Sequence, residues 1–331
     1  MSLPLKIALV ATCLWSACAC AADNYSAHPA ALELVDELVQ EQDFDREELL
    51  LVFSSAQRQE SILTAIARPA EKSKPWYEYR EIFLNDKRLE QGVEFYREHR
   101  ETLERAERET GVPAEMIVSI IGVETYYGRV AGSYRVIDAL STLAFDYPPR
   151  SDFFTGELKS YLILTRQQGF DPLALKGSYA GAMGYGQFMP SSFLGYAVDF
   201  DGDGVADIWN NPVDAIGSVA NYFQRHGWRK GETVVVGATV KGQVPEQWFV
   251  QGRKDLQPAH TVAEFAGVGI KPVTAVAPQT LATAMKFELE NSYEYWLGFH
   301  NFYVITRYNH SAMYAMCVYE LSRRIAARAA P

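Results

Sequence analysis

Cysteine is scarce in this chain. Four cysteines occur in 331 residues, and three of them, Cys13, Cys18 and Cys20, fall near the N-terminus. Cys317 is the one cysteine that follows, so the body of the chain cannot form an internal disulfide. The fold therefore depends on a packed core, and 331 residues with 48% apolar content suffice for one large domain or two modest ones.

An excess of positive charge and long apolar runs are also missing. The chain has 31 Lys and Arg against 41 Asp and Glu, which gives a formal net charge of -10. This balance argues against nucleic acid or an anionic membrane as a partner, whereas a neutral or polar substrate stays compatible with it. Outside the N-terminal segment, no stretch is long and apolar enough to span a bilayer.

Several signatures of ligand binding are absent too. His226, His260, His300 and His310 lack the spacing of a zinc site, and we interpret each as a surface or core residue. The chain has no phosphate-binding loop, no internal repeat and no low-complexity tract. The function must therefore be sought in short polar motifs.

The N-terminus has the pattern of a secretory signal. Lys6 supplies a positive charge, Ile7–Trp15 is apolar, and Ala19-Cys20-Ala21 fits a cleavage site between small residues. The apolar run is too short to cross a bilayer. We predict a signal peptide over residues 1–21 and export to the periplasm.

A lipoprotein signal is the less favoured alternative. Cys18 or Cys20 would then be acylated, and the protein would be attached to the outer membrane. The leucine expected three positions before the acylated cysteine is missing, because Trp15 and Ala17 stand there.

Helical periodicity dominates the chain up to Gly231. The predicted helices cover residues 49–56, 76–84, 87–110, 133–143, 151–168 and 214–224, and a closing amphipathic helix covers 309–328. Asp45 with Glu48 fits a capping box, and Ser151 or Asp152 can cap a later helix. Past Gly231, β-branched residues predict short strands at 232–240 and around positions 262, 268, 270, 272 and 273.

Glu124 closes an apolar stripe on one predicted helix. Pro113 begins this helix and Gly128 ends it, while three isoleucines (117, 120 and 121) share the face of Glu124. Desolvation raises a carboxyl pKa, so an acid at this place is suited to proton donation. The alternative is a structural Glu at a helix end that pairs with Arg129 or Arg135.

A glycine-rich stretch follows at residues 177–191. Four glycines alternate with aromatic and small residues, which lets the backbone approach a ligand or another segment closely. A tight structural turn is the alternative.

An aspartate-rich loop begins at Asp199. Carboxylates at loop positions 1, 3 and 5, glycine at 6 and the Val205 carbonyl at 7 match a calcium loop of the EF-hand type. Position 12 is Asn210 in place of the usual Glu. Asp214 is a candidate for the missing bidentate ligand, and Asp207 at position 9 is a weaker one. Oxygen ligands without His or Cys favour a structural calcium ion over zinc, and an acidic solvated turn is the alternative.

Four motifs occur in one order along the chain. They are Gly-Val-Glu-Thr-Tyr-Tyr-Gly at 122–128, Ala-Met-Gly-Tyr-Gly-Gln-Phe-Met-Pro-Ser at 182–191, the aspartate-rich loop, and Asp-Ala-Ile-Gly-Ser-Val-Ala-Asn-Tyr-Phe at 214–223. Together they resemble the membrane-bound lytic murein transglycosylase B family. The resemblance covers nearly all of the chain after the signal.

The resemblance implies a mostly α fold of the α+β class. It comprises a lysozyme-like helical core with an EF-hand-like calcium loop, a flanking helical domain and a small β subdomain. We expect a helical domain at 22–110 joined by the C-terminal helix 309–331, a core at 111–230 with 286–308, and a β-rich subdomain at 231–285.

The resemblance also implies the site residues. Glu124 matches the single catalytic acid and base. The positions that match the glycan groove are Ser178, Gln187, Phe188, Met189 and Tyr222, with Tyr79 and Tyr308 as further members. The positions that match the calcium ligands are Asp199, Asp201, Asp203, the Val205 carbonyl and Asp214. No organic cofactor is expected.

The activity implied by the resemblance is lytic. The enzyme cleaves the bond between N-acetylmuramic acid and N-acetylglucosamine in peptidoglycan strands and closes a 1,6-anhydro ring, so no water is added. Ordinary glycosidases need two carboxylates, and no second one shares a motif with Glu124. The alternatives are a lysozyme-like hydrolase and a calcium-dependent wall-binding protein without catalysis. Other proteins of cell-wall assembly are further expected partners.

Overall fold

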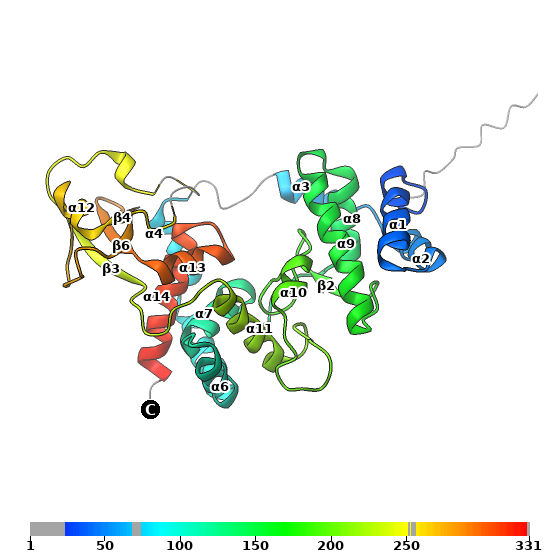
Figure 1. Ribbon diagram of the computed structural model, residues 1–331, viewed down its shortest axis with the longest axis horizontal. Helices are drawn as coiled ribbons and strands as arrows, with labels where there is room; N and C mark the ends of the chain where they lie inside the picture. Colours follow the sequence, from blue (N-terminus) through cyan, green and yellow to red (C-terminus); the bar gives the residue numbers. More distant parts are fainter. Residues whose placement is uncertain (1–23, 68–73, 251, 253–255, 330–331) are drawn as a thin grey trace, which may run out of the picture.

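The structure is a computed structural model that describes residues 24–67, 74–250, 252 and 256–329. The predicted signal peptide, with Cys18 and Cys20, lies outside the described residues. Helices predominate and a small β region is present, as predicted (Figure 1). Within the described ranges, no helix combines the length and the apolar character needed to cross a membrane.

The helices and strands follow in chain order. The α-helices are α1 (Pro29–Gln42), α2 (Arg46–Ser55), α3 (Glu60–Ala67), α4 (Trp76–Phe83), α5 (Asp86–Glu98), α6 (Arg100–Thr110), α7 (Ala114–Thr125), α8 (Val136–Asp146), α9 (Ser151–Gln168), α10 (Pro190–Tyr196), α11 (Pro212–Arg225), α12 (Val262–Gly267), α13 (His300–Tyr308) and α14 (Ala312–Ala329). The strands are β1 (Tyr134–Arg135), β2 (Lys176–Gly177), β3 (Val235–Val240), β4 (His260–Thr261), β5 (Ile270–Pro272), β6 (Leu281–Glu288) and β7 (Tyr293–Gly298), and short 3-10 helices cover Pro148–Arg150 and Glu246–Trp248.

Helix α7 is the centre of the helical core. It packs against α5, α6, α11 and α14, and Figure 1 shows it in the middle of the molecule. Ile117, Ile120 and Ile121 are fully buried, which confirms the predicted apolar stripe. Burying each of these side chains contributes roughly 1.5–3 kcal/mol. The helix that carries Glu124 is thus held by neighbours on all sides.

The predicted helical domain at 22–110 is not one packing unit. Helices α1 and α3 pack against α9 and α8, whereas α4, α5 and α6 pack around α7, α11 and α14 (Figure 1). The contact of the first helices with α8 is polar as well as apolar. The backbone N–H of Gln57 donates to Asp138 at 2.9 Å, and the Tyr25 hydroxyl donates to Asp146 at 2.6 Å. Periodicity showed that these helices have apolar faces but not which neighbours cover them.

The strands after Gly231 form a five-stranded antiparallel sheet with the order β4-β6-β7-β3-β5. A separate apolar cluster that includes Phe249, Phe265, Ile270 and Leu297 packs against it. The boundary predicted at 285 is wrong, because β6 crosses it and the β6–β7 hairpin extends the sheet to Gly298. A strand at Val262 is also wrong, since this residue begins α12 behind a capping box.

Several helix boundaries differ from the prediction. The helix predicted at 87–110 is two helices, because His99 leaves helical geometry (φ -107°, ψ 23°) between α5 and α6. The helix predicted to begin at Ser133 begins at Val136, after the short pairing of β1 with β2. The predicted cap at Asp45 is confirmed, since its side chain accepts from the N–H of Glu48 at 2.9 Å. At α9 the capping residue is Arg150, and the predicted cap Ser151 is the first helical residue.

Candidate active site and metal loop

Glu124 lies in the last turn of α7 and is half-buried. Its Oε1 accepts a hydrogen bond from the hydroxyl of Tyr314 on α14 at 2.5 Å. The two arginines considered as structural partners point to other acids. Arg135 forms a double hydrogen bond with Asp138, and Arg129 lies 3.7 Å from Glu94.

Three tyrosines respond to the charge of Glu124. Burial and then the Glu124 carboxylate raise the pKa values of Tyr308 and Tyr314 well above the ordinary value. Burial also raises the pKa of Tyr222, with a smaller contribution from Glu124. All three hydroxyls therefore stay protonated at neutral pH and act as hydrogen-bond donors around the acid.

The turn after Glu124 is unusual. Tyr126, Tyr127 and Gly128 follow one another with positive φ values of 56°, 62° and 81°. A left-handed conformation costs a residue other than glycine roughly 1–3 kcal/mol, so the surroundings must hold this turn. Helix α7 consequently ends at Thr125, three residues before the predicted end at Gly128.

Thr125 ties this turn to the glycine-rich loop. Its hydroxyl donates to the carbonyl of Tyr185 at 2.8 Å and accepts from the N–H of Gly128 at 3.0 Å. Gly128 also has no room for a side chain, because a Cβ there would lie 2.2 Å from the ring of Tyr185. Thr125 and Gly128, on the two sides of the turn, are therefore held against the glycine-rich stretch at residues 177–191.

Arg88 on α5 supports the same turn from behind. Its guanidinium carbon lies 4.6 Å from the ring centroid of Tyr126 and 5.1 Å from that of Phe83. One Nη donates to the carbonyl of Ile82 at 2.7 Å, and burial lowers the pKa of Arg88. The carbonyl of Arg88 accepts from the hydroxyl of Tyr127 at 2.9 Å.

Tyr127 belongs to the core. It is 4% exposed, and its ring fills a space between α5 and α7 that two glycines leave open. A Cβ on Gly92 would lie 2.4 Å from the Tyr127 hydroxyl, and a Cβ on Gly122 would lie 2.6 Å from it. The ring therefore positions the turn and does not line an open groove.

The glycine-rich stretch brings backbone close to other segments, as predicted. A Cβ on Gly184 would lie 2.4 Å from the carbonyl oxygen of Ile208, and one on Gly186 would lie 2.8 Å from the Tyr308 hydroxyl. The hydroxyl of Tyr308 donates to the Gly186 carbonyl at 2.6 Å. The stretch thus lies between α7 and α13.

Ser178 and Gln187 are the polar residues predicted in this stretch, and both are half-buried. The Ser178 hydroxyl oxygen accepts from the N–H groups of Ala180 and Ala182 at 3.3 and 3.0 Å, which leaves its O–H able to donate. The Gln187 side-chain nitrogen donates to two carbonyls, those of Ala131 and Gly184, each at 3.1 Å. Its amide oxygen is the atom suited to a substrate N–H.

The predicted aromatic members of the groove pack on one another. The rings of Phe188, Tyr222 and Tyr308 lie 4.7–6.0 Å apart between centroids. Phe188 is 3% exposed and Tyr222 is 8% exposed, so they form the floor of the site and offer little open face for sugar stacking. Met189 is half-buried and caps the start of α10.

Tyr79 on α4 is buried at 3% exposure and packs on Phe83 with ring centroids 5.4 Å apart. Its charge when ionised would raise the pKa of Tyr314, which places the two hydroxyls near each other. Tyr79 therefore adjoins the acid through Tyr314. The structure brings together Glu124, Tyr79, Tyr222 and Tyr308 from four different helices.

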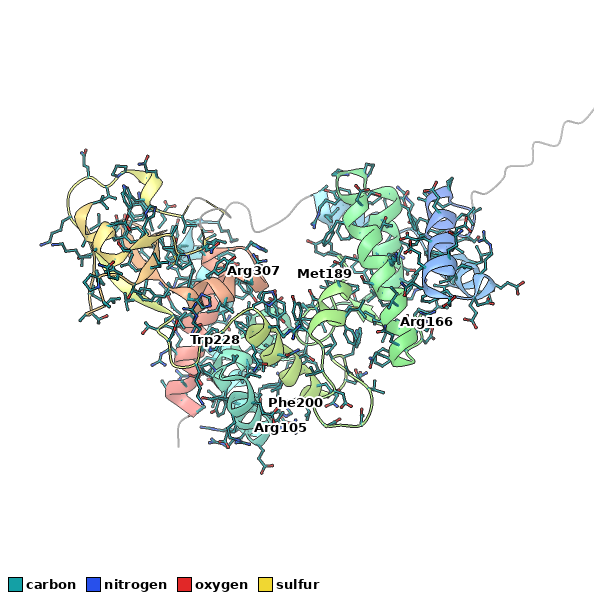
Figure 2. The ribbon with its side chains drawn as sticks, viewed as in Figure 1. Arg105, Arg166, Met189, Phe200, Trp228 and Arg307 are labelled. Atoms are coloured by element: carbon teal, nitrogen blue, oxygen red, sulfur yellow. The ribbon has the colours of Figure 1, made fainter. Side chains whose placement is uncertain are left out.

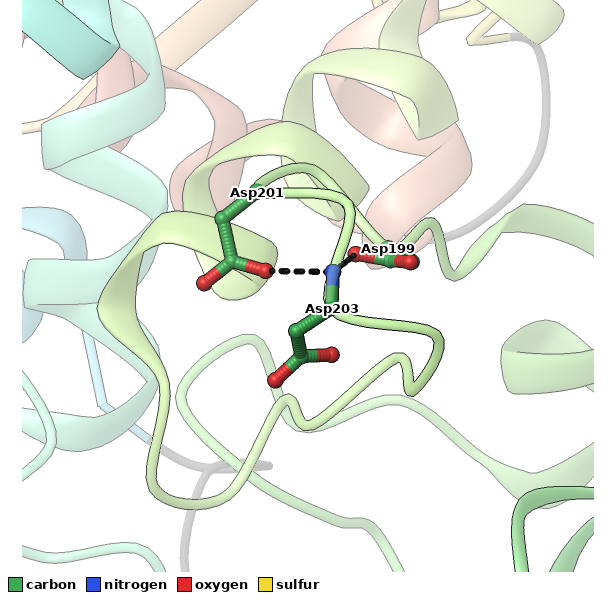
Figure 3. A group of neighbouring side chains, drawn as sticks. All are labelled: Asp199, Asp201 and Asp203. Atoms are coloured by element: carbon green, nitrogen blue, oxygen red, sulfur yellow. Dashed lines mark hydrogen bonds between the residues drawn. The ribbon is translucent and has the colours of Figure 1, made fainter.

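The aspartate-rich loop gathers three carboxylates at one point. Ligand oxygens of Asp199, Asp201 and Asp203 lie within 4.8 Å of one another, and all three side chains are exposed (Figure 3). Asp199 accepts from the N–H groups of Gly202, Asp203 and Gly204, and these bonds lower its pKa, that from Gly204 most. Among the described residues, no Lys or Arg forms an ion pair with these three carboxylates, so the cluster fits a hard cation.

Asp214 lies beneath the loop and is fully buried. Its two oxygens accept from the N–H groups of Phe200 and Asp207, at 2.7 and 2.8 Å. These bonds fix both ends of the loop, and Asp214 is outside the group of three clustered carboxylates. Asp207 turns to its own backbone, where Oδ1 accepts from the N–H groups of Trp209 and Asn210.

The loop is anchored to the helical core by one cation–π contact. The guanidinium carbon of Arg105 on α6 lies 3.7 Å from the ring centroid of Phe200, and the two residues meet in Figure 2. The Arg105 side chain also donates to the Phe200 carbonyl. On the other side, a Cβ on Gly217 of α11 would lie 2.3 Å from the Phe200 ring.

Two residues of the site were missed in the sequence. Tyr314 lies in a closing amphipathic helix, where an aromatic residue is ordinarily core, and Arg88 lies near the start of the helix predicted at 87–110, which is rich in charged residues. Neither belongs to a local motif. Their only signal is the residue type. Arg88 is 9% exposed and Tyr314 is 3% exposed, and a buried guanidinium or hydroxyl needs a polar partner.

Comparisons with known proteins agree with this arrangement. A family model described as Transglycosylase SLT domain matches residues 26–323. Membrane-bound lytic murein transglycosylase B of Escherichia coli (strain K12) is 43% identical over 312 residues, which cover 92% of this chain and 84% of that protein.

Solved structures give the same result. The catenated lytic transglycosylase SltB1 from Pseudomonas aeruginosa has a TM-score of 0.89 and 53% identity, covering 93% of this chain and 100% of that chain. Escherichia coli Slt35 in complex with calcium has a TM-score of 0.84 and 43% identity, covering 92% and 95%. SltB3 from Pseudomonas aeruginosa in complex with NAG-NAM-pentapeptide has a TM-score of 0.76 and 28% identity, covering 88% and 78%.

The match over residues 26–323, the 43% identity and the shared fold lead to one conclusion. The chain belongs to the transglycosylase SLT domain family and is a lytic transglycosylase of the murein transglycosylase B type.

Proposed function

We propose that Glu124 is the single acid and base with which this chain cleaves peptidoglycan between N-acetylmuramic acid and N-acetylglucosamine. The observation that carries this proposal is the position of Glu124. It is half-buried at the end of α7 and accepts a hydrogen bond from Tyr314 at 2.5 Å. Its charge raises the pKa values of Tyr222 and Tyr308. The substrate class follows from a relative named as a lytic murein transglycosylase and from the similar structure of SltB3 in complex with NAG-NAM-pentapeptide.

The reaction needs two proton transfers at one carboxyl group. Glu124 first gives its proton to the glycosidic oxygen as the bond from that oxygen to C1 of the muramic acid breaks. The carbonyl oxygen of the N-acetyl group stabilises the positive charge at C1. Glu124, now a carboxylate, removes the proton of the C6 hydroxyl, and the new O6–C1 bond closes the anhydro ring. The proton returns to Glu124, and no water is consumed.

The number of carboxylates favours this route over hydrolysis. Glycosidases that use water need a second carboxylate at about 5–9.5 Å from the first. The charge of Glu124 raises the pKa values of Tyr222 and Tyr308, and no second carboxylate shares a sequence motif with Glu124. A C6 hydroxyl held over C1 reacts as a neighbouring group, and this proximity favours ring closure over attack by water.

The glycan contacts are assigned to the loop and the aromatic floor. The amide oxygen of Gln187 and the hydroxyl of Ser178 are suited to orient the N-acetyl group. Met189, half-buried beside α10, offers an apolar contact to a sugar face. Phe188, Tyr222 and Tyr308 support this surface from below, and Tyr79 supports it through Tyr314.

We assign calcium to the aspartate-rich loop as a structural ion. Asp199, Asp201 and Asp203 supply clustered carboxylates, and the Val205 carbonyl follows at the seventh position of the loop. Asp214 contributes by holding the backbone of the loop through the N–H groups of Phe200 and Asp207. A bound ion would neutralise the three charges and so stabilise the loop against Phe200 and α11. Slt35 in complex with calcium is consistent with this assignment.

The proposed location is the periplasm, where the glycan strands are. The signal pattern at residues 1–21 supports export. Attachment to the outer membrane depends on acylation of Cys18 or Cys20 and is the alternative. Partners among proteins of cell-wall assembly are part of the proposal.

The proposal is tested by mass spectrometry of muropeptides released from purified sacculi. Wild type should release products that end in 1,6-anhydro-N-acetylmuramic acid. Glu124→Gln keeps the shape and removes the titratable proton, so release should fall roughly 10²–10⁴-fold while the melting temperature stays the same. Asp152→Asn makes the same kind of change at an exposed position of α9. It is the matched control and should keep wild-type activity.

Three other outcomes would contradict the proposal. Products heavier by one water would mean a hydrolase and would require a second carboxylate. Normal activity of Glu124→Gln would remove Glu124 from the chemistry. Binding to walls without any release would support a wall-binding protein without catalysis.

A further inference from the structure

Two adjoining cavities lie away from Glu124. One has a volume of about 970 Å³ and the other about 610 Å³, and both are formed between the five-stranded sheet and α13. They share Gln257, Pro258 and Tyr303, so they adjoin each other. Volumes of roughly 300–1,000 Å³ are those of ligand sites, so a small ligand or a short peptide would fit.

Helix α13 connects these cavities to the active site. Tyr303 and Arg307 line the smaller cavity, while the next residue, Tyr308, donates to Gly186 in the glycine-rich stretch. The carbonyl of Arg307 accepts from the Tyr222 hydroxyl at 2.7 Å. Arg307, labelled in Figure 2, therefore lies at the boundary between the aromatic floor and the cavity.

The charge in the cavities favours an anion. Among the described residues that line them, the basic ones are Arg229, Arg307, His260, His300 and His310, and the one acid, Glu232, lies 3.5 Å from Arg229. Within the part of the chain that is described, Arg307 has no carboxylate within ion-pair distance. Its Nη1 lies 3.1 Å from the Nε2 of His310, and its guanidinium carbon lies 5.8 Å from the ring centroid of Tyr303.

Apolar groups complete the smaller cavity. Trp248 stacks near His260 with ring centroids 4.8 Å apart and meets Phe265 edge to face at 5.7 Å. A guanidinium that no described carboxylate pairs, beside half-buried aromatic rings and exposed amides, is suited to a peptide that carries carboxylates. Arginine binds a carboxylate through two parallel hydrogen bonds.

We propose that these two cavities bind the carboxylate-bearing peptide attached to the glycan, with Arg307 holding one carboxylate. This inference rests on the proposed function, because the peptide extends from the sugar whose bond Glu124 cleaves. The lengths agree. Helix α13 rises about 12 Å from Tyr308, beside the candidate active site, to His300 in the larger cavity, at about 1.5 Å per residue. A peptide of five extended residues spans up to about 17 Å and so could cover this distance.

The test compares two substrates. One is peptide-bearing glycan strands, and the other is the same strands after an amidase has removed the peptides. The wild type should show a kcat/KM about tenfold higher for the peptide-bearing strands, as expected for one charge-assisted contact. In Arg307→Gln this ratio should fall to about one, and Arg307→Lys, which keeps the charge, should retain part of the preference.

A matched control and a second variant keep the test decisive. Arg108→Gln makes the same change of charge at an exposed position of α6, outside both cavities, and should keep the wild-type ratio. His260→Glu adds a negative charge at an exposed position of the smaller cavity and should lower the ratio several-fold, independently of the folding of Arg307→Gln.

Binding is measured separately with Glu124→Gln protein and an uncleaved tetrasaccharide, with and without its peptides. Tighter binding of the peptide-bearing form that disappears when Arg307→Gln is added supports the inference. Equal binding of both forms, or an unchanged ratio in Arg307→Gln and His260→Glu, would overturn it. Failure of the wild type to cleave either strand would overturn the proposed function instead.

Discussion

The hydroxyl of Tyr314 on α14 donates to Oε1 of Glu124 on α7, with 2.5 Å between the two oxygens. The residues are 190 positions apart in the chain. Because α14 packs along α7, the C-terminal helix supplies a direct partner of the candidate acid. The closing helix is thus part of the candidate active site as well as of the core.

Tyr314→Phe should therefore change catalysis more than stability. The substitution keeps the buried ring and removes one donor to a charged group, a bond worth about 1.5–3 kcal/mol. We expect kcat to fall about tenfold or more. The lost bond favours the carboxylate over the acid, and Glu124 must be protonated to start the reaction, so the alkaline limb of the pH–rate profile should move to higher pH. Tyr319→Phe on the same helix is the control, and an unchanged pH profile in Tyr314→Phe would remove Tyr314 from this role.

Arg88→Lys tests the support of the turn after Glu124. Lysine keeps the charge but cannot stack its head group on Tyr126 as the planar guanidinium does at 4.6 Å. The turn has positive φ at Tyr126 and Tyr127, so weaker support should displace Glu124. We expect kcat to fall about tenfold with a smaller change in KM. Arg129→Lys, on the exposed surface beside Tyr126, should stay within about twofold of wild type; equal losses in both variants would argue against a specific role for Arg88.

Asp203→Ala tests the calcium loop. Calcium at 100 times its dissociation constant should stabilise the wild type by about 2.7 kcal/mol and raise its melting temperature. The variant should lose this rise, because one of three clustered carboxylates is gone. Asp152→Ala removes the same charge at an exposed position of α9 and should keep the rise in melting temperature with calcium. Calcium titrations followed by melting temperature measure both, and a full response in Asp203→Ala would mean that the loop is not the site.

The same ion should be dispensable for the chemistry itself. Where the protein remains folded after chelation, cleavage of sacculi should continue at nearly the wild-type rate. Circular dichroism recorded on the same sample separates loss of fold from loss of activity. Immediate inactivation of a protein that is still folded would make calcium part of the catalytic machinery.

Glu115 provides a prediction about pH. Burial raises the pKa of this carboxyl in the first turn of α7, with the nearby Glu107 adding to the shift. A raised pKa in the folded state means that ionisation destabilises the fold above that pKa, and the penalty disappears below the pKa of the unfolded chain. Glu115→Gln should therefore raise the melting temperature at pH 7 and leave it unchanged near pH 3.

Exposed Glu101 on α6 is the control for that measurement. Glu101→Gln should alter the melting temperature little at either pH, because a solvated carboxylate has no desolvation penalty to lose. A gain of equal size in both variants would assign the effect to net charge and not to burial of Glu115.

Local patterns were the part of the molecule that could be predicted. The stripe that ends at Glu124 depends on neighbours three and four residues apart, and the isoleucines on it are buried. The clustered carboxylates at Asp199, Asp201 and Asp203 lie within five residues, so a single loop brings them together. The close approaches at Gly184 and Gly186 also follow from residue type at fixed positions.

Long-range packing decided the rest. The pairing of Glu124 with Tyr314, the stacking of Arg88 on Tyr126 and the extension of the sheet through β7 join segments that no local periodicity relates. The split of the first helices between α8–α9 and the α7 core has the same origin. The sequence by itself determined which residue is the candidate acid and where a cation could bind, because spacing along one helix or loop sets both. Only the tertiary structure decided what surrounds this residue. Its neighbours come from segments far apart in the chain, and they meet only when the helices pack with complementary shapes and paired polar groups.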